Sequence, residues 1–118
     1  MTVSPGFHQF VVDQLGRATT AVRTKKMFGG VGIYADDLFF ALIDDDTLYF
    51  KVDDSNRGDF EVRGMGPFRP FGEHGEVMQY YAVPADLLED GDVLRAWVEK
   101  ALAVARQKKK RPAKRKLK

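Results

Sequence analysis

The sequence predicts a two-layer α+β domain, in which an antiparallel sheet of about five strands carries N-terminal and C-terminal helices on one face. Three observations predict this class. A capped amphipathic segment opens the chain, short apolar runs separated by acidic turns fill its middle, and an apolar pattern of helical period closes it. The 118 residues have room for one such domain, and because cysteine is absent its core forms without disulfides or thiolate metal sites.

The first predicted element is a helix at the N-terminus. Ser4 is a typical N-cap residue, and Pro5 fits the first helical turn. The apolar residues that should form the buried stripe are Phe7, Phe10 or Val11, and Leu15. Gly16 is expected to weaken or end this helix, although residues 18–22 could continue it.

The middle of the chain is predicted to be an antiparallel meander. Three apolar runs, 26–34, 38–43 and 47–52, are separated by two turns that contain consecutive aspartates. In the third run apolar residues alternate with Tyr49 and Lys51, so one face of the sheet should be buried and the other partly wet. An exposed edge strand of this sheet would allow a homodimer.

A short helix over 55–61 is expected to bring Phe60 to the core. Residues 64–76 are rich in Gly and Pro, and we interpret them as a loop with one short strand around 68–71. The run 78–83 is predicted to be the last strand of the sheet.

The last predicted helix follows, with Asp86 or Asp90 as its candidate cap. Its apolar residues at helical spacing are Val93, Leu94, Trp97, Val98, Ala101, Leu102 and Ala105. The apolar pattern stops after Gln107. Residues 1–105 are therefore expected to form the domain, and residues 106–118 a basic tail that is disordered or begins as frayed helix.

Charge is divided unequally between these two parts. The basic tail holds nine Lys and Arg residues and no acid, which leaves ten basic against seventeen acidic residues in 1–105, a net charge of −7. The tail residues predicted to contact nucleic acid are Lys108, Lys109, Lys110, Arg111, Lys114, Arg115, Lys116 and Lys118. Such contact would be non-specific, because the tail has no aromatic residue for stacking on bases. The alternative is a solubilising tail that pairs loosely with the acidic body.

Other candidate sites have structural interpretations. The glycine-rich segment 28–32 lacks the spacing of a phosphate-binding loop, so a strand bend or bulge is expected there. The aspartates at 44–46 and 53–54 lack the spacing of a calcium loop and suit solvated turns. His8 and His74 have no partner at metal-ligand spacing, so neither a metal nor a cofactor is predicted.

Two further groups of residues allow a functional interpretation. Tyr34, Tyr49, Tyr80 and Tyr81 are expected to pack across strands, and the alternative is a face that binds a partner or a second copy. Acid–base chemistry by Glu73, His74 and Glu76 would make the loop 64–76 the site of an enzyme or small-ligand binder. No catalytic constellation surrounds these residues, so no catalytic residue is assigned.

Several segments together resemble a known family. FGGVG at 28–32, LYFKVDD at 48–54 and MQYYAVP at 78–84 are similar, in order and spacing, to the N-terminal domain of TfoX/Sxy proteins, and the resemblance covers residues 7–105. It implies a two-layer α+β fold and a bacterial role in regulating natural competence. Full-length members act there with a cyclic-AMP receptor regulator at promoters. Those members carry a second helical domain, whereas this chain has only its basic tail after the first.

The resulting expectation is a non-enzymatic regulatory or adaptor domain. It would bind a protein partner, such as a transcription regulator, and touch DNA non-specifically through its tail. A DNA-associated accessory protein dominated by the tail is a further hypothesis. The longest nearly apolar run, 38–43, is far too short to span a bilayer, and no signal peptide or lipid anchor is evident, so a cytoplasmic protein without membrane attachment is expected.

Overall fold

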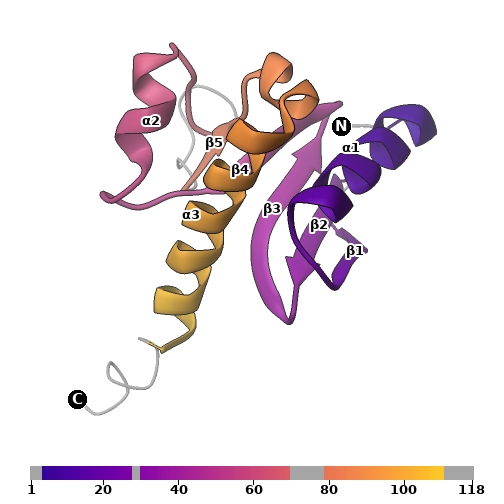
Figure 1. Ribbon diagram of the computed structural model, residues 1–118, viewed down its shortest axis with the longest axis horizontal. Coiled ribbons are helices and arrows are strands. Elements are labelled where there is room, and N and C mark those ends of the chain that lie inside the picture. The colour runs from indigo at the N-terminus through magenta and orange to yellow at the C-terminus, as the bar shows by residue number, and fades with distance from the viewer. Residues whose placement is uncertain (1–3, 28–29, 70–78, 111–118) are drawn as a thin grey trace.

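A five-stranded antiparallel sheet forms one layer of the structure, and helices form the other (Figure 1). This computed structural model describes residues 4–27, 30–69 and 79–110. The elements along the chain are α1 (Pro5–Ala18), β1 (Val22–Met27), β2 (Gly30–Ala35), β3 (Leu38–Asp44), β4 (Thr47–Lys51), α2 (Arg57–Val62), β5 (Tyr80–Ala82), the 3-10 helix η1 (Ala85–Glu89) and α3 (Gly91–Lys110).

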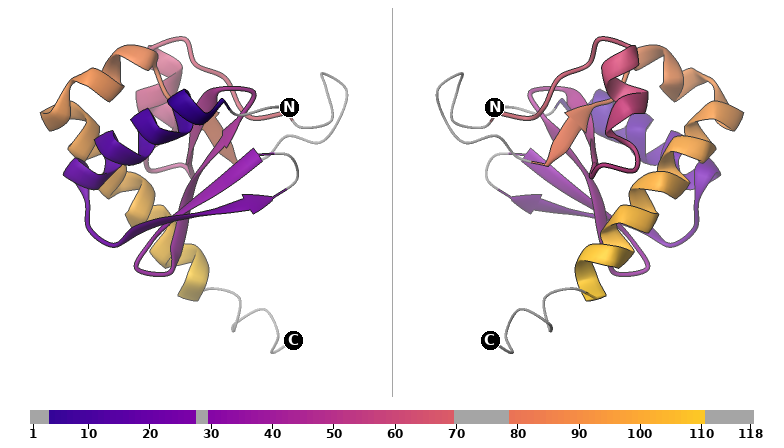
Figure 2. Two further views of the ribbon diagram at one scale, coloured as in Figure 1. Left: turned by 90° about the vertical axis from the view of Figure 1, so that its right-hand side faces the viewer. Right: turned by 90° about the vertical axis from the view of Figure 1, so that its left-hand side faces the viewer.

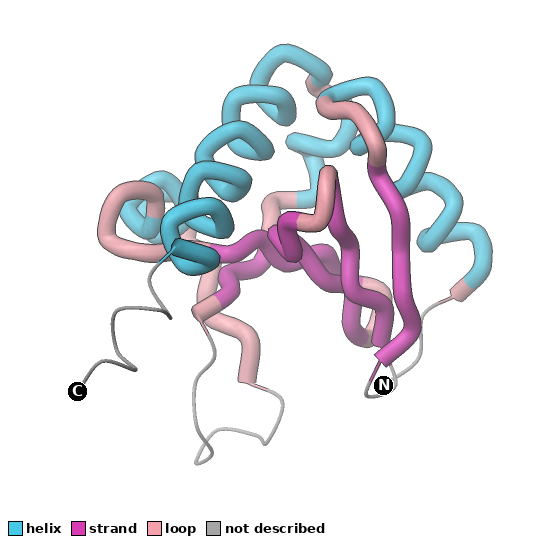
Figure 3. The backbone as a smooth tube through the Cα atoms, turned by 90° about the horizontal axis from the view of Figure 1, so that it is seen from below, coloured by secondary structure: helices cyan, strands magenta, loops and turns pink. Residues whose placement is uncertain are grey.

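The strands follow one another in the order β1-β2-β3-β4-β5, and the helices lie on one side of them (Figure 3). Helix α3 crosses β3 and β4, and α1 packs beside α3 and β1 (Figure 2). The predicted two-layer α+β fold is confirmed. Within the described part of the chain, no helix has the length and apolar character needed to cross a membrane.

Helix α1 begins as predicted. The Phe7 amide donates to the Ser4 hydroxyl at 3.4 Å, and Pro5 occupies the first turn. Val11 and Leu15 are buried and Phe7 is partly buried. Phe10, the other candidate for the stripe, is 38% exposed.

The end of α1 differs from one expectation. The helix passes through Gly16 and ends at Ala18, so its continuation over 18–22 is wrong. Val22 instead begins β1.

The predicted single strand at 26–34 is also wrong, because two strands occupy this region. β1 pairs with β2 from Val22↔Ala35 to Met27↔Gly30. β1 was missed because it carries Arg23, Lys25 and Lys26 at the sheet edge, where exposed charge replaces the usual apolar run.

The two acidic turns connect β2 to β3 and β3 to β4. Their central residues have positive φ, with Asp36 at 50°, Asp37 at 70°, Asp45 at 52° and Asp46 at 54°. Paired left-handed residues make the type I′ hairpin, whose twist matches the flanking strands, and aspartate tolerates this conformation. The turn interpretation of residues 44–46 is therefore confirmed.

A β-bulge bends β3. Ile33 pairs with Ala41 and Tyr34 pairs with Phe39, so Phe40 is an extra residue in the ladder. The bulge places Phe40 and Ala41, although adjacent, both in the core. This bulge is not the bend or bulge predicted for the glycine-rich segment 28–32, because its register shift lies between Ile33 and Tyr34.

The region after β4 contains the predicted short helix, α2, with Phe60 fully buried. The last strand, β5, is confirmed but covers only Tyr80–Ala82. In place of the strand expected around 68–71, the described residues contain one isolated bridge, Pro67↔Tyr81. Residues 70–71 lie outside the described part of the chain. β1 supplies the fifth strand in its place.

Helix α3 closes the core. Asp90 accepts from the Val93 amide at 3.4 Å and caps the helix, whereas Asp86 accepts two hydrogen bonds from Arg63 at 2.9 Å. Among the predicted apolar residues, Val93 is exposed, while Leu94, Val98, Ala101 and Ala105 are buried. The helix continues to Lys110, beyond the end of the apolar pattern at Gln107.

Candidate functional site

The sheet face opposite the helices carries a row of aromatic and basic side chains, which we call the aromatic face. The strand register places them on one side, because Tyr34 pairs with Arg23 and Phe39, and Lys51 pairs with Tyr80. None of these side chains belongs to the buried cluster beneath α1 and α3. The members of the aromatic face are Arg23, Tyr34, Phe39, Tyr49, Lys51, Phe68 and Tyr80.

The rings of the aromatic face contact one another across strands. Tyr34 and Phe39 stack with centroids 5.0 Å apart and planes 20° apart. Phe39 and Tyr80 lie 5.8 Å apart, and Tyr49 lies 4.8 Å from Phe68. Such pairs contribute about 0.5–1.5 kcal/mol beyond their buried area, so the rings are held in defined positions.

Two cations lie over these rings. The Arg23 guanidinium is 4.8 Å from the Tyr34 centroid, and it also pairs with Asp37 at 3.0 Å. The Lys51 ammonium lies 5.4 Å from the centroids of both Phe39 and Tyr80. The face therefore combines π surface with positive charge, a composition typical of contact surfaces for anionic or aromatic partners.

Burial changes the protonation equilibria of this face. It raises the pKa of Tyr80, and the neighbouring Tyr34 adds to the effect. Burial lowers the pKa of Lys51, and the positive charge of Lys108 lowers it further. The pKa of Tyr49 is raised by burial and then by Asp44 and Asp45.

The tyrosines therefore lie on both faces of the sheet. Tyr34, Tyr49 and Tyr80 belong to the aromatic face, whereas Tyr81 packs against Phe60 at 5.9 Å and donates to Glu61 at 3.3 Å. The predicted cross-strand packing is confirmed for Tyr34 and Tyr80, which both contact Phe39 of β3. Tyr49 and Tyr81 instead contact Phe68 of the following loop and Phe60 of α2.

The predicted nucleic-acid residues of the basic tail are only partly described. Lys108 is exposed on the last turns of α3, and the helix continues through Lys109 and Lys110. The remaining five, which lie outside the described residues, are Arg111, Lys114, Arg115, Lys116 and Lys118.

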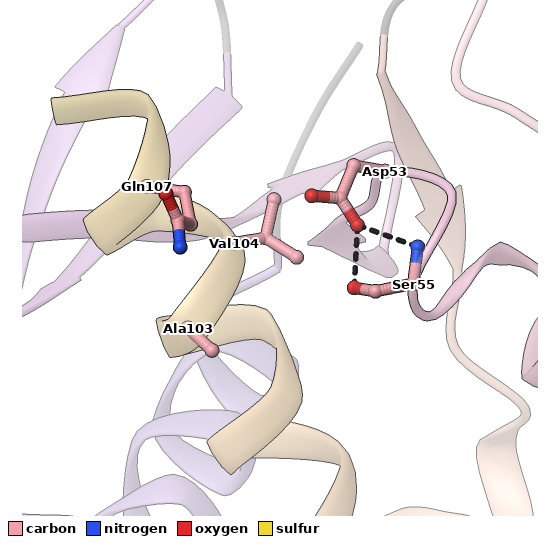
Figure 4. A pocket seen from close by; sticks show the side chains of 5 residues that line it. All are labelled: Asp53, Ser55, Ala103, Val104 and Gln107. Carbon is pink, nitrogen blue, oxygen red and sulfur yellow. Dashed lines mark hydrogen bonds between the residues drawn. The ribbon is translucent and has the colours of Figure 1, made fainter. Parts of the chain in front are cut away.

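Two hollows flank this end of α3. One, of about 410 Å³, lies between α3 and the loop after β4 (Figure 4). There the Ser55 hydroxyl and amide both donate to Asp53, at 2.5 and 2.8 Å, so this serine closes a turn. The other, of about 280 Å³, is lined by residues of β3, β4 and α3 that include Lys51 and Lys108.

Sequence reasoning missed Asn56, the one buried polar residue among those described. Its side-chain oxygen accepts from the Asp53 amide at 2.9 Å, and its amide nitrogen donates to the Lys51 carbonyl at 3.1 Å. It thereby fixes the end of β4, from which Lys51 reaches the aromatic face. An Asn after two aspartates is a turn signal, and nothing in the sequence marks this one as buried.

The glycine-rich segment has a structural role at Gly30. A Cβ at this position would lie 2.4 Å from the Ile43 carbonyl oxygen, so the two backbones approach too closely for a side chain. Phe28 and Gly29 lie outside the described residues.

The remaining candidates give no assembled site. Within residues 4–27, 30–69 and 79–110, no group of three His, Asp or Glu side chains could hold a metal ion. His8 is partly buried on α1. His74, Glu73 and Glu76, the candidates for acid–base chemistry, lie outside the described residues.

Comparison with known proteins supports the resemblance noted in the sequence. No curated protein matches the chain. The sequence profile of the TfoX N-terminal domain matches residues 13–105, which span α1 to α3 and include every member of the aromatic face. The chain therefore belongs to the TfoX N-terminal domain family.

Proposed function

We propose that this protein is a non-enzymatic regulatory adaptor of the cytoplasm that binds a protein partner through its aromatic face. The carrying observation is the set of preorganised rings and cations on the face of the sheet opposite the helices (Figure 3). Aromatic and arginine residues are enriched among the few residues that supply most of the binding energy at protein interfaces. The resemblance to TfoX/Sxy proteins supports a partner among transcription regulators, with natural competence as the process.

Non-specific contact with DNA forms the second part of this proposal. Nine cations without an acid in residues 106–118 favour attraction to phosphates, and Lys108 is presented on a helix that begins in the folded domain. The tail would hold the domain near DNA while the aromatic face binds the partner.

A non-enzymatic role is consistent with the described polar groups. Ser55, the hydroxyl that lines the larger hollow, is engaged with Asp53, and no histidine lines that hollow. The same Asp53 oxygen also accepts from the Ser55 amide, so this Ser–Asp pair is explained as a local turn.

The test of the protein contact uses variants of the aromatic face. We expect Tyr49→Ala and Phe39→Ala to weaken binding of a purified cyclic-AMP receptor regulator by at least about tenfold, the cost of an interface anchor. Val62→Ser is the control, because Val62 is 85% exposed on α2. Equal binding by all variants, or no binding by the wild-type chain, would contradict this part.

The test of the DNA contact compares the full chain with a variant that ends at Gln107, on generic duplex DNA at low and near-physiological salt. We expect the full chain to bind with a steep salt dependence and the shortened chain to lose binding. If neither binds at low salt, the nucleic-acid part of the proposal fails.

A further inference from the structure

The smaller hollow lies where the last turns of α3 pass the open end of β3 and β4. These strands pair only from Ala41↔Phe50 to Asp44↔Thr47, and the bulge at Phe40 turns β3 away beyond that point. The start of β3 and the end of β4 therefore leave a space beside α3. The hollow of about 280 Å³ is lined by Asp37, Leu38, Phe39, Lys51, Ala105 and Lys108.

Positive charge converges on this space from two layers of the fold. Lys51 reaches it from β4 and Lys108 from α3, and their repulsion contributes to the lowered pKa of Lys51. Asp37 is the single acidic residue of the lining, and Arg23 already pairs with it at 3.0 Å. No described carboxylate lies within ion-pair distance of either lysine.

Lys51 is held in place before any ligand arrives. Its ammonium lies over the Phe39 and Tyr80 rings, and its carbonyl is fixed by Asn56. A half-buried lysine that no described carboxylate approaches bears a desolvation cost, because the rings replace only part of its hydration. An anion between the two ammonium groups would offset this cost and their mutual repulsion.

The size and setting of the hollow favour a phosphate group over a carboxylate. A phosphate presents several oxygens, so two separate ammonium groups can bind it at once. The hollow also opens at the start of a dense run of cations, 108–118, which suits a ligand that continues as further phosphates.

We propose that Lys51 and Lys108 bind a phosphate group in this hollow, with Phe39 as its apolar wall. The proposal deepens the DNA contact proposed above, and it rests on that function only for the source of the phosphate. A nucleic-acid backbone and a free phosphate or nucleotide share this chemistry, and the experiment distinguishes them.

The experiment uses the full chain and four single variants. Lys51→Met and Lys108→Met each remove one charge and keep most of the apolar stem, so packing is preserved. Lys51→Arg keeps the charge. Lys100→Met is the matched control, because Lys100 is also on α3 but is already paired with Asp59 at 2.7 Å. Thermal unfolding reports whether each variant is folded. If Lys51→Met is unfolded, Lys108→Met provides the test, because Lys108 is exposed.

Two ligands are titrated at low salt: inorganic diphosphate, followed by NMR, and a fluorescent duplex DNA, followed by anisotropy. We expect diphosphate to shift the resonances of Lys51 and Lys108. Both methionine variants should bind it about tenfold or more weakly, as for loss of a charged hydrogen bond, while Lys100→Met and Lys51→Arg retain binding. Lys51→Met should weaken DNA binding similarly, although its tail is complete.

The outcomes separate this site from the general tail contact. If diphosphate binding depends on Lys51 and DNA binding does not, the phosphate site is supported and its ligand is a free phosphate or nucleotide. If DNA binds through the tail while both lysine variants match the wild type with both ligands, the site is refuted and the proposed function remains. Absence of any shift at Lys51 with diphosphate also refutes it.

Discussion

Single side chains fix the geometry on which the proposed surfaces depend. Asn56 joins the loop after β4 to the strand itself, and it is only 2% exposed. Lys51 and Tyr80 are adjacent across β4 and β5. Burial lowers the pKa of Lys51 and raises the pKa of Tyr80, so it favours the neutral form of both side chains. The aromatic face therefore depends on buried polar groups as well as on rings.

Asn56→Ala should lower the free energy of unfolding by about 2 kcal/mol, because it leaves a buried amide and carbonyl without their partners. Urea unfolding measures this difference. Ser55→Ala is the control, since its exposed hydroxyl only closes a local turn and its loss should matter much less. A difference between the two variants of less than about 0.5 kcal/mol would contradict a structural role for Asn56.

Tyr80 should make stability fall at alkaline pH. Because its pKa is raised in the folded state, its contribution is complete below the ordinary tyrosine pKa of about 10 and is lost as pH rises above it. The pKa of Lys51 is lowered in the folded state, so Lys51 makes stability rise with pH up to about pH 10.5. A variant is therefore needed to separate the effect of Tyr80 from that of Lys51. Tyr80→Phe should lose less stability than the wild type between pH 8 and pH 11 in urea unfolding. An equal loss would show that Tyr80 does not ionise on unfolding in this range.

The elements differ in how much tertiary support they need. α1 has a cap, a proline in its first turn and a buried stripe, and it tolerates an interior glycine at Gly16. β2 depends on its neighbour, because Gly30 lies directly against the backbone of β3. Glycine therefore weakens helix α1, whereas it permits the close approach of β2 to β3.

Substitution of these two glycines by alanine should have opposite effects. Gly16→Ala meets open space in a helix and should stabilise the protein by up to about 1 kcal/mol, since alanine has the higher helix propensity. Gly30→Ala places its Cβ 2.4 Å from the Ile43 oxygen, and displacement of the backbone should cost about 1–3 kcal/mol. Thermal or urea unfolding of both variants tests this, and a stabilised Gly30→Ala variant would refute the close approach.

The molecule as a whole is organised around α3. This helix packs on β3 and β4 and contacts α1 (Figure 1). It also pairs with α2 through Lys100 and Asp59, and it carries Lys108 to the hollow beside β4. The sheet ends on one side at β1, whose outer edge pairs with no strand among the described residues. Its cations Arg23, Lys25 and Lys26 protect that edge from pairing.

Removal of this protection should increase self-association. Two copies paired edge to edge through β1 would bring like charges together, so we expect the wild-type homodimer to be weak. A variant with Lys25→Thr and Lys26→Thr should dimerise more readily, as measured by sedimentation velocity at several concentrations. Lys100→Thr is a control for lost charge away from the edge. A wild-type dimer as strong as that of the variant would contradict a protective role.

The α+β class, the capped first helix, α2 with Phe60 and the long last helix were predictable, because local rules of capping, period and turn chemistry determine them. The acidic hairpins were predictable for the same reason. β1 was not, because an edge strand exposes much of its surface and needs no apolar run. Phe10 and Val11 were equivalent by spacing, and only packing against α3 placed Val11 inside.

The features of the functional surface can also be separated into those that the sequence predicts and those that need the tertiary structure. The sequence by itself determined the family, the separation of an acidic body from basic residues at its end, and the alternation that places Tyr49 and Lys51 on one face. Only the tertiary structure decided that Lys51 and Lys108, far apart in the chain, line one hollow, and that Asn56 is buried and donates to the Lys51 carbonyl. The physical reason is that charge and periodicity are local properties, whereas proximity across layers depends on how a bulged strand and a crossing helix pack.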